Sequence, residues 1–213
     1  MIVLALDACL DACSVAVVAD GQALVEMSEP MRRGHQERLA VMVEAVMANA
    51  GRGFADLDRI GVTVGPGSFT GLRVGLAFAK GLGLALDRPV VGVGVLEALA
   101  QDAGDGFVAS VIDARRGQVY MQAFDAALAL MAPDVLPAST AAARLVELWS
   151  GGPATLTGPG CALLAGVLPG AVLIEHAAPN PRIVALLAAQ ARPPFPPPRP
   201  LYLRAPDARL AAP

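Results

Sequence analysis

Residues 65–73 read Gly-Pro-Gly-Ser-Phe-Thr-Gly-Leu-Arg and join an apolar run, 60–64, to a second apolar stretch that continues to residue 86. Glycine and proline at this density predict a tight turn. Ser68 or Thr70 is a suitable N-cap for a helix that begins near Thr70. The stretch therefore predicts a buried strand, a turn and a long helix, which is an element order typical of α/β proteins.

The same run fails three templates for phosphate binding or nucleophilic catalysis. A P-loop has four residues between its glycines and then Lys-Ser/Thr, whereas five separate Gly65 from Gly71 here and Leu-Arg follows. The dinucleotide fingerprint requires a third glycine at the position of Thr70. A nucleophile elbow requires glycines where Pro66 and Thr70 flank Ser68. We therefore do not expect Ser68 to be a nucleophile.

Small residues recur every fourth position along the predicted helix, at Gly71, Gly75, Ala79 and Gly83. Each interior glycine costs a helix about 1 kcal/mol relative to alanine, so the ridge indicates a close approach by another element. The other positions are mostly apolar, apart from Arg73 and Lys80. Two interpretations remain open: burial inside the same domain, or partial burial against another chain. We favour the second.

The preceding predicted helix, 36–50, supports a partner interface. It carries one apolar stripe that is sufficient for a core and a second stripe behind it, with a narrow polar edge at Glu37 and Glu44. Two such helices bring more apolar surface than one small sheet covers, and exposed apolar patches usually mark interfaces. The predicted interface residues are Leu39, Val41, Met42, Ala45, Val46, Ala48, Gly71, Arg73, Gly75, Phe78, Ala79 and Leu82.

Composition restricts the class of protein. The chain has 213 residues, 55% hydrophobic and 16% charged, with a mean hydropathy of +0.55. Arg73 and Lys80 interrupt the apolar helix, and prolines break the uncharged run 151–174, so we expect no membrane span. The amino terminus lacks a basic region of the signal-peptide kind. We expect a cytoplasmic protein.

Charge and metal-ligand content argue against autonomous RNA or metal binding. The formal net charge is −3, which disfavours a basic nucleic-acid face. Three cysteines and two histidines do not assemble into a zinc pattern. We expect reduced core cysteines, no metal, no cofactor, and any RNA contact through a partner.

The element order predicts the fold class. Expected strands and helices alternate as three strands, helix, strand, helix, strand, helix, with an Asp20-Gly21 hairpin in the first meander. This order matches the RNase H-like half of the actin and sugar-kinase superfamily. A strand that ends in aspartate occurs twice, at Asp7 and Asp113. We expect an amino-terminal lobe at 1–102, a smaller lobe at 103–192 and a proline-rich tail at 193–213.

Asp7 and Asp113 allow two interpretations. As paired metal ligands across a cleft they indicate an ATP-dependent phosphotransferase, and as strand-end turn residues they have no chemical role. The turn after Asp7 has no glycine, and the turn after Asp113 carries Arg115 and Arg116. We favour the turn interpretation, and we expect His35 to be a surface or capping residue.

Several stretches together resemble the bacterial TsaB family, formerly called YeaZ. The resemblance extends over essentially the whole chain, with residues 65–73 as its most specific motif. A departure is the turn 8–10, which reads Ala-Cys-Leu where the family usually has a Thr/Ser-rich turn. The positions that carry the family motif are Asp7, Gly65, Pro66, Gly67, Ser68, Phe69, Thr70, Asp113, Arg115 and Tyr120.

The resemblance implies a function. Members of that family are non-catalytic subunits of the machinery that makes N6-threonylcarbamoyladenosine in tRNA. The resemblance implies pairing with the catalytic subunit TsaD through the first two helices, with the ATPase TsaE completing the complex. It leaves open a homodimer through the same helices. An older view of the wider family as glycoproteases implies instead proteolysis and a bound metal.

Overall fold

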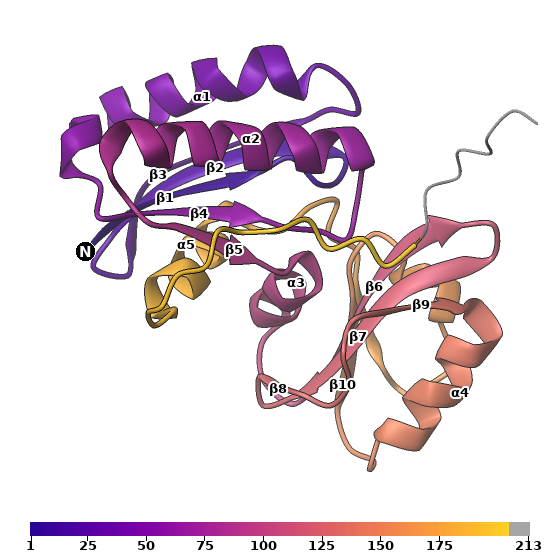
Figure 1. Ribbon diagram of the computed structural model, residues 1–213. Coiled ribbons are helices and arrows are strands. Elements are labelled where there is room, and N and C mark those ends of the chain that lie inside the picture. The colour runs from indigo at the N-terminus through magenta and orange to yellow at the C-terminus, as the bar shows by residue number, and fades with distance from the viewer. Residues whose placement is uncertain (205–213) are drawn as a thin grey trace, which may run out of the picture.

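The first lobe is built on a five-stranded sheet in the order β3-β2-β1-β4-β5. The computed structural model describes residues 1–204. A meander of antiparallel strands is followed by two parallel ones. Their bounds are β1 Ile2–Asp7, β2 Ala12–Ala19, β3 Gln22–Pro30, β4 Arg59–Thr63 and β5 Val90–Val93. Helices α1 (His35–Asn49) and α2 (Phe69–Leu86) cover one face, and α5 (Pro181–Gln190) covers the other (Figure 1).

Burial explains the sequence pattern of these strands. Strand β1 and most of β2 are buried on both faces, which is why they are continuous apolar runs. The edge strand β3 alternates exposed and half-buried residues. Asp20 (φ 49°) and Gly21 (φ 82°) both lie in the left-handed region that a two-residue Asp-Gly hairpin requires. The predicted hairpin is confirmed.

The small-residue ridge of α2 faces the protein's own sheet. Gly71, Gly75, Ala79 and Gly83 are all buried. A Cβ atom at Gly83 would lie 2.3 Å from Cγ2 of Val90 on β5. The ridge therefore lets α2 lie close to its own strands, and burial inside the same domain accounts for it. This corrects our preference for burial of the ridge against another chain.

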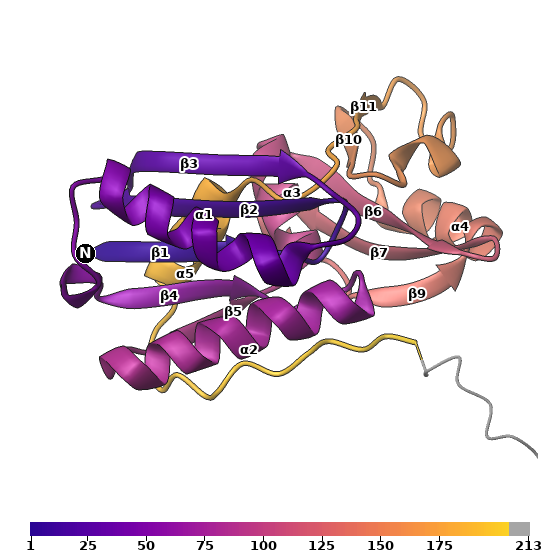
Figure 2. The ribbon, with the colours of Figure 1, turned by 90° about the horizontal axis from the view of Figure 1, so that it is seen from above.

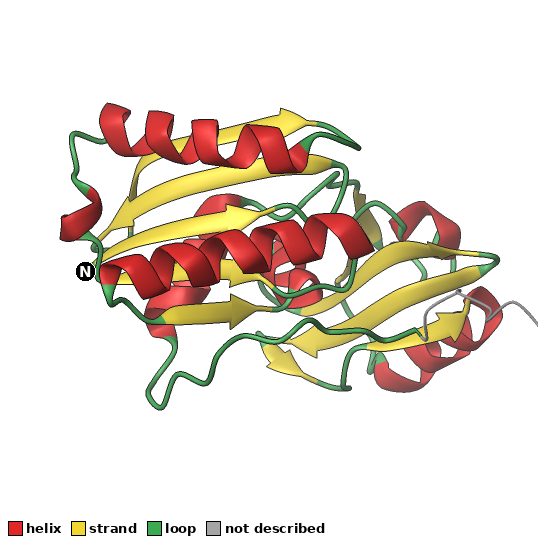
Figure 3. Ribbon diagram, turned by 45° about the horizontal axis from the view of Figure 1, so that its top comes forward, coloured by secondary structure: helices red, strands yellow, loops and turns green. Residues whose placement is uncertain are grey.

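The second lobe has a sheet in the order β11-β10-β6-β7-β8, with β9 also paired to β7. Figure 3 shows the two sheets side by side. A separate core around Val119, Met121, Leu145 and Leu156 fills this lobe. Its elements are β6 Phe107–Arg115, β7 Gln118–Asp125, β8 Leu128–Ala129, β9 Asp134–Pro137, α4 Ala138–Leu148, β10 Ala154–Thr157 and β11 Val172–Ile174. Helix α3 (Val95–Ala103) packs on this second sheet and also touches α5.

The chain returns to the first lobe before it ends. Helix α5 packs on β1, β2 and β4, so the residues after β11 belong with the first sheet rather than with the expected lobe 103–192. The proline-rich segment after α5 has no helix or strand through residue 204. Figure 2 shows it running past α2 toward the second lobe. The expected tail residues 205–213 lie outside the described part.

Helix α2 has an unusual surface for a core helix. Its 18 residues have a mean hydropathy of 1.3, which is enough by length and composition to cross a membrane, and a third of that window is buried. Helices in the cores of folded domains pass the same test. Leu72 and Leu76 are buried together with the glycines, where α2 packs on β4 and β5, whereas Phe78 and Leu82 are half-buried and Phe69 and Leu84 are exposed.

Candidate functional site

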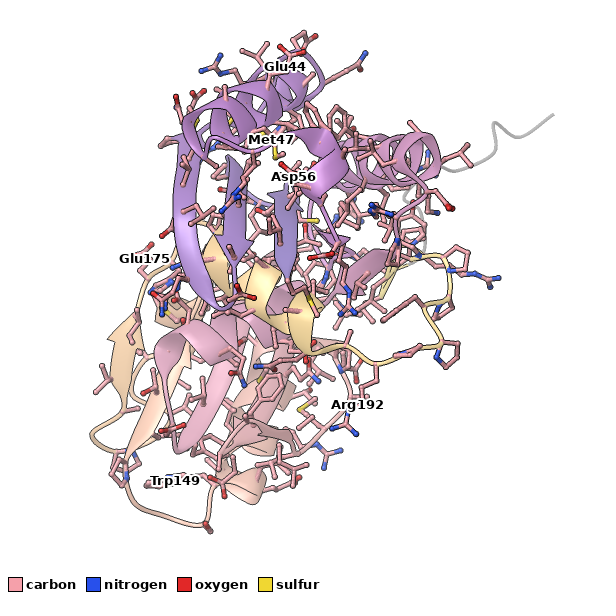
Figure 4. All side chains as sticks on the ribbon, turned by 90° about the vertical axis from the view of Figure 1, so that its left-hand side faces the viewer. Glu44, Met47, Asp56, Trp149, Glu175 and Arg192 are labelled. Atoms are coloured by element: carbon pink, nitrogen blue, oxygen red, sulfur yellow. The ribbon has the colours of Figure 1, made fainter. Side chains whose placement is uncertain are left out.

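A cleft of about 720 Å³ lies between the lobes, where the motifs singled out in the sequence meet. The turn after β1, the loop before α2 and the hairpin between β6 and β7 all line it. Glu175, on the segment that returns to the first lobe, lies at the junction of the lobes (Figure 4). The lining residues are Cys9, Leu10, Asp11, Arg32, Gly67, Ser68, Ile112, Asp113, Ala114, Arg115, Tyr120, Pro159, Glu175 and Ala177.

The two arginines of the cleft are paired with carboxylates. Arg32 Nε donates to Oδ2 of Asp11 at 3.0 Å. The Arg115 guanidinium donates to Oδ2 of Asp113 at 3.0 Å, and the Arg115 backbone N–H donates to Oδ1 of Asp113 at 2.7 Å. Exposed ion pairs of this kind are worth about 0–1 kcal/mol, so they break readily. The carboxylates would nevertheless remain beside any bound phosphate and repel it.

Asp7 does not line the cleft, so the structure does not bring it together with Asp113 as a metal pair. Its carboxylate is completely buried. Its Oδ1 accepts hydrogen bonds from the Thr63 hydroxyl (2.6 Å) and the Cys9 N–H (3.2 Å), while Oδ2 has no partner. Burial raises the pKa of Asp7 to about 6. The strand-end turn interpretation therefore fits this residue.

The glycine loop packs onto the turn after β1. The Ser68 N–H donates to the Cys9 carbonyl at 2.6 Å, and a Cβ atom at Gly67 would lie 2.2 Å from that same oxygen. Ser68 Oγ accepts from the Gly71 N–H at 3.3 Å and caps α2, as the sequence predicts. The glycines of the motif thus allow backbone segments to approach one another. Backbone packing is therefore sufficient to explain these glycines, without a bound phosphate.

The metal-ligand types are dispersed. In residues 1–204 no group of three or more His, Cys, Asp or Glu side chains could hold a metal ion. All three cysteines are free and buried, as expected. His35, expected to be a surface or capping residue, is instead buried, and its Nε2 lies 3.2 Å from the Ala12 carbonyl. That contact ties the start of α1 to β2.

The predicted interface residues divide into two groups. Six lie in the protein's own core and cannot contact a partner directly, which corrects their assignment: Leu39, Met42, Val46, Gly71, Gly75 and Ala79. Six are on the surface or half-buried: Val41, Ala45, Ala48, Arg73, Phe78 and Leu82. Leu84 was not among the predicted residues, although its exposure of 86% is the largest among the exposed large apolar residues. Its spacing of eleven from Arg73 places both on one helix face, a signal that was available in the sequence.

We call the exposed or half-buried apolar residues of α1 and α2 the α1/α2 face: Val41, Ala45, Ala48, Phe78, Leu82 and Leu84, of which Leu84 lies on the Arg73 side of α2. Helices α1 and α2 lie side by side on the same side of the sheet (Figure 1). Glu44 is exposed on α1, while Met47 is buried against the sheet (Figure 4). The face is therefore apolar with a thin charged margin. Surfaces of this composition fit a protein partner.

At one end of this face an aromatic cluster joins α2 to the tail. The Arg73 guanidinium lies 3.7 Å from the Phe69 ring centre and donates to the Tyr202 hydroxyl at 3.0 Å. The Phe69 and Tyr202 ring centres are 5.5 Å apart. The motif residues Phe69 and Arg73 therefore position the tail. They do not enter the cleft.

Two lobes around a cleft, each built on an RNase H-like sheet, define a protein of the actin-like and sugar-kinase class. Its cleft has its cations paired and its glycine loop packed against protein backbone. The chain belongs to the TsaB family, also known as YeaZ. The fold class and the family expected from the sequence are thus confirmed.

Several comparisons establish this membership. A family model described as TsaD, tRNA N6-adenosine threonylcarbamoyltransferase, matches residues 28–154. The tRNA threonylcarbamoyladenosine biosynthesis protein TsaB of Escherichia coli is 39% identical over 124 residues, which cover 56% of this chain and 53% of that protein. An uncharacterized protein of Mycobacterium tuberculosis is 38% identical over 220 residues, which cover 99% of this chain and 95% of the relative. The match spans about half the length of the curated TsaB proteins.

Solved structures agree. YeaZ from Pseudomonas aeruginosa superposes with a TM-score of 0.78 at 32% identity, covering 88% of this chain and 90% of that one. Component A of the (R)-2-hydroxyglutaryl-CoA dehydratase of Acidaminococcus fermentans has a TM-score of 0.55 at 11% identity, over 88% and 97% of the two chains. The similarity to component A, at 11% identity, supports only a shared fold.

Proposed function

We propose that this protein is a non-catalytic subunit in the biosynthesis of N6-threonylcarbamoyladenosine at adenosine 37 of tRNA, and that it pairs through its α1/α2 face with the catalytic subunit TsaD. The TsaB relatives carry the name of this pathway. The TsaD family model matches residues 28–154, which include α1 and α2. A partner with a related lobe would present a related pair of helices.

The observation that carries this proposal is the outward surface of α2. Leu84 is 86% exposed, and Phe78 and Leu82 are half-buried on the same helix. On the neighbouring helix α1, Val41 is 50% exposed. Burial of apolar surface contributes about 25 cal/mol per Å², so covering these side chains favours association.

The charges at the margin also suit pairing of two similar lobes. Glu37 and Glu44 lie on exposed positions of α1, and Arg73 and Lys80 lie on exposed positions of α2. In a two-fold arrangement the same patch faces itself, and when the axis runs parallel to the two helices α1 of one lobe meets α2 of the other. Acidic residues then face basic ones. This supports pairing with TsaD and also a homodimer of the isolated chain.

The cleft supports an accessory role. Asp7 is buried away from it, and its two arginines are engaged by carboxylates. The proposal therefore assigns threonylcarbamoyl transfer to TsaD, ATP hydrolysis to TsaE, and tRNA contact to the complex as a whole. All of these steps would take place in the cytoplasm.

The test is association with purified TsaD from the same organism, measured by size-exclusion chromatography with light scattering. We expect a heterodimer with the wild type and its loss with Val41→Glu/Leu84→Glu. Val146→Glu, at a 57% exposed position on α4 of the second lobe, is the matched control and retains binding. Gly75→Leu is unsuitable because Gly75 is buried in the chain's own core.

Two results would contradict the proposal. The first is a wild type that does not associate with TsaD, and the second is a double variant that associates as well as the control. In a reconstituted reaction, the wild type and Val146→Glu should support formation of the modified nucleoside, and Val41→Glu/Leu84→Glu should not. The alternative, an ATP-dependent phosphotransferase, requires Mg-ATP binding near the micromolar range in a calorimetric titration, which is about −8 kcal/mol.

A further inference from the structure

The described end of the chain makes contacts in both lobes, although α5, from which it emerges, belongs to the first. Leu201 N–H donates to the Val64 carbonyl at 2.8 Å, directly after β4. Three residues later, the Arg204 guanidinium donates to the Ala114 carbonyl at 2.8 Å and to Oε1 of Gln118. Ala114 and Gln118 flank the turn between β6 and β7 in the second lobe.

We propose that residues 201–204 form a strap that fixes the separation of the two lobes across the cleft. The first-lobe end of this strap is firmly held. Pro198 is buried and packs near Gly92 of β5, where an added Cβ would lie 3.0 Å from Cβ of Pro198. Tyr202 then lies against Phe69 and accepts a hydrogen bond from Arg73. The second-lobe end is the Arg204 guanidinium.

The chain itself connects the lobes twice, after α3 and again before α5. Connections of that kind allow hinge motion in which a few residues absorb the change in backbone angles. A third attachment away from these connections restricts the rotation, because opening the cleft requires the Arg204 hydrogen bonds to break. Hydrogen bonds to charged groups are stronger than those between neutral groups. The strap is therefore strong enough to hold one arrangement and weak enough to release.

The strap acts on the wall of the cleft. Ala114 lines the cleft next to Asp113 and Arg115, so Arg204 holds the part of the second lobe that faces Ser68 and Asp11. The strap also begins beside the α1/α2 face, because Arg73 shares the exposed side of α2 with Leu84. A partner on that face would lie beside Tyr202; this consequence rests on the proposed function, whereas the strap itself does not.

The experiment measures the distance between spin labels in the two lobes of the full chain without any partner. Labels are placed on Gln22→Cys in β3 and Ala143→Cys in α4, both exposed positions. Double electron–electron resonance compares Arg204→Met with the matched control Arg199→Met, an exposed arginine of the same tail. Leu201→Pro removes the N–H that binds Val64, and Leu201→Ala is its control.

We expect Arg204→Met and Leu201→Pro to give the same broadened and shifted distance distribution, because they release opposite ends of one strap. Both controls keep the wild-type distribution. Wild-type distributions in Arg204→Met and Leu201→Pro would overturn the proposal. A change in one of these two variants alone would also overturn it, since it would indicate a local anchor. Far-ultraviolet circular dichroism confirms that each variant is folded.

Discussion

Gly71 lies so close to Ala8 that a Cβ atom on it would be 1.9 Å from the Ala8 carbonyl oxygen. This contact joins the start of α2 to the turn after β1, and backbone cannot move aside as a flexible side chain can. The glycine at this position of the motif is therefore required by packing. It sets the height of α2 above the sheet, and with it the position of the α1/α2 face.

Gly71→Ala should lower the free energy of unfolding by at least about 3 kcal/mol, because the new methyl group overpacks a rigid contact. Gly81→Ala is the matched control on the same helix. Nothing lies within 4 Å of a Cβ atom at Gly81, so this change should stabilise the protein by up to about 1 kcal/mol. Urea denaturation measures both. Equal stability of the two variants would show that the close contact does not exist.

Asp7 should make stability depend on pH between about 4 and 6. Its pKa rises from the ordinary value of 3.8 to about 6 in the folded state, chiefly through burial. The native state therefore holds the proton more tightly, and the resulting stability is complete below pH 3.8 and lost as the pH rises through 6. The expected loss is on the order of 2 kcal/mol.

Urea denaturation of wild type and Asp7→Asn at several pH values isolates this contribution. Between pH 4 and pH 7, the unfolding free energy of the wild type should fall relative to that of Asp7→Asn by an amount on the order of 2 kcal/mol. Asp105→Asn, at an exposed position, should follow the wild type throughout. A difference that stays constant with pH would mean that the Asp7 carboxyl is not desolvated.

Arg59→Met should loosen α5 selectively. The Arg59 guanidinium donates to the carbonyls of Ala188, Ala189 and Ala191 at the carboxyl end of that helix and lies 4.4 Å from the Phe195 ring centre. Its loss should cost about 3 kcal/mol. Hydrogen exchange should accelerate in residues 181–195 and remain unchanged in α4. Arg182→Met, exposed on α5, is the control, and uniform acceleration over the chain would contradict this local role.

The isolated chain should self-associate through the α1/α2 face. Sedimentation velocity should show a concentration-dependent dimer that Leu84→Glu abolishes. Leu128→Glu is the control, because Leu128 is 71% exposed on β8 of the second lobe. Neither change should alter stability by more than about 0.5 kcal/mol. A dimer that survives Leu84→Glu but not Leu128→Glu would place the contact on the second lobe.

The three cysteines should not react in the native protein. Burial raises the pKa of Cys13 to about 11 and raises the pKa of Cys9 and Cys161 as well. A thiol reagent at pH 8 should therefore modify none of them before denaturant is added and all three afterwards. Rapid modification in native buffer would show that a described cysteine is accessible. In that case the native cysteines would also take up the spin label, and the distance measurement would have to use variants that lack them.

Residue patterns in the sequence predicted much of the fold. Alternation between apolar runs and turn residues predicted the meander, α1, α2 and the first strands of the second lobe, because these signals are local. The turn after Asp20 and the cap at Ser68 followed from side-chain chemistry in the same way. The return of α5 to the first sheet was not predicted, since nothing local in residues 181–190 indicates which sheet they cover.

Which helix face is buried could not be predicted for α2. Its glycine ridge and its leucines are both compatible with a core, and the structure buries the ridge. The predicted interface therefore contained three residues of α2 that lie inside, Gly71, Gly75 and Ala79, besides three buried residues of α1, and it omitted Leu84. Similarly, the positions of Asp7 and Asp113 at two strand ends suggested a shared site, whereas burial separates Asp7 from the cleft.

The sequence by itself determined the element order of the first lobe up to the first strands of the second, the class of fold, the family, and the absence of a phosphate-loop or nucleophile template in residues 65–73. The element order and the failed templates follow from periodicity and spacing, which are properties of neighbours along the chain, whereas the family follows from the resemblance of several stretches, above all residues 65–73. Tertiary structure alone decided the outward surface of α2, the partners of Asp7 and the path of the tail from Val64 to Ala114. Each of these depends on contacts between residues far apart in sequence, where burial and backbone geometry select one of several arrangements that the local pattern allows.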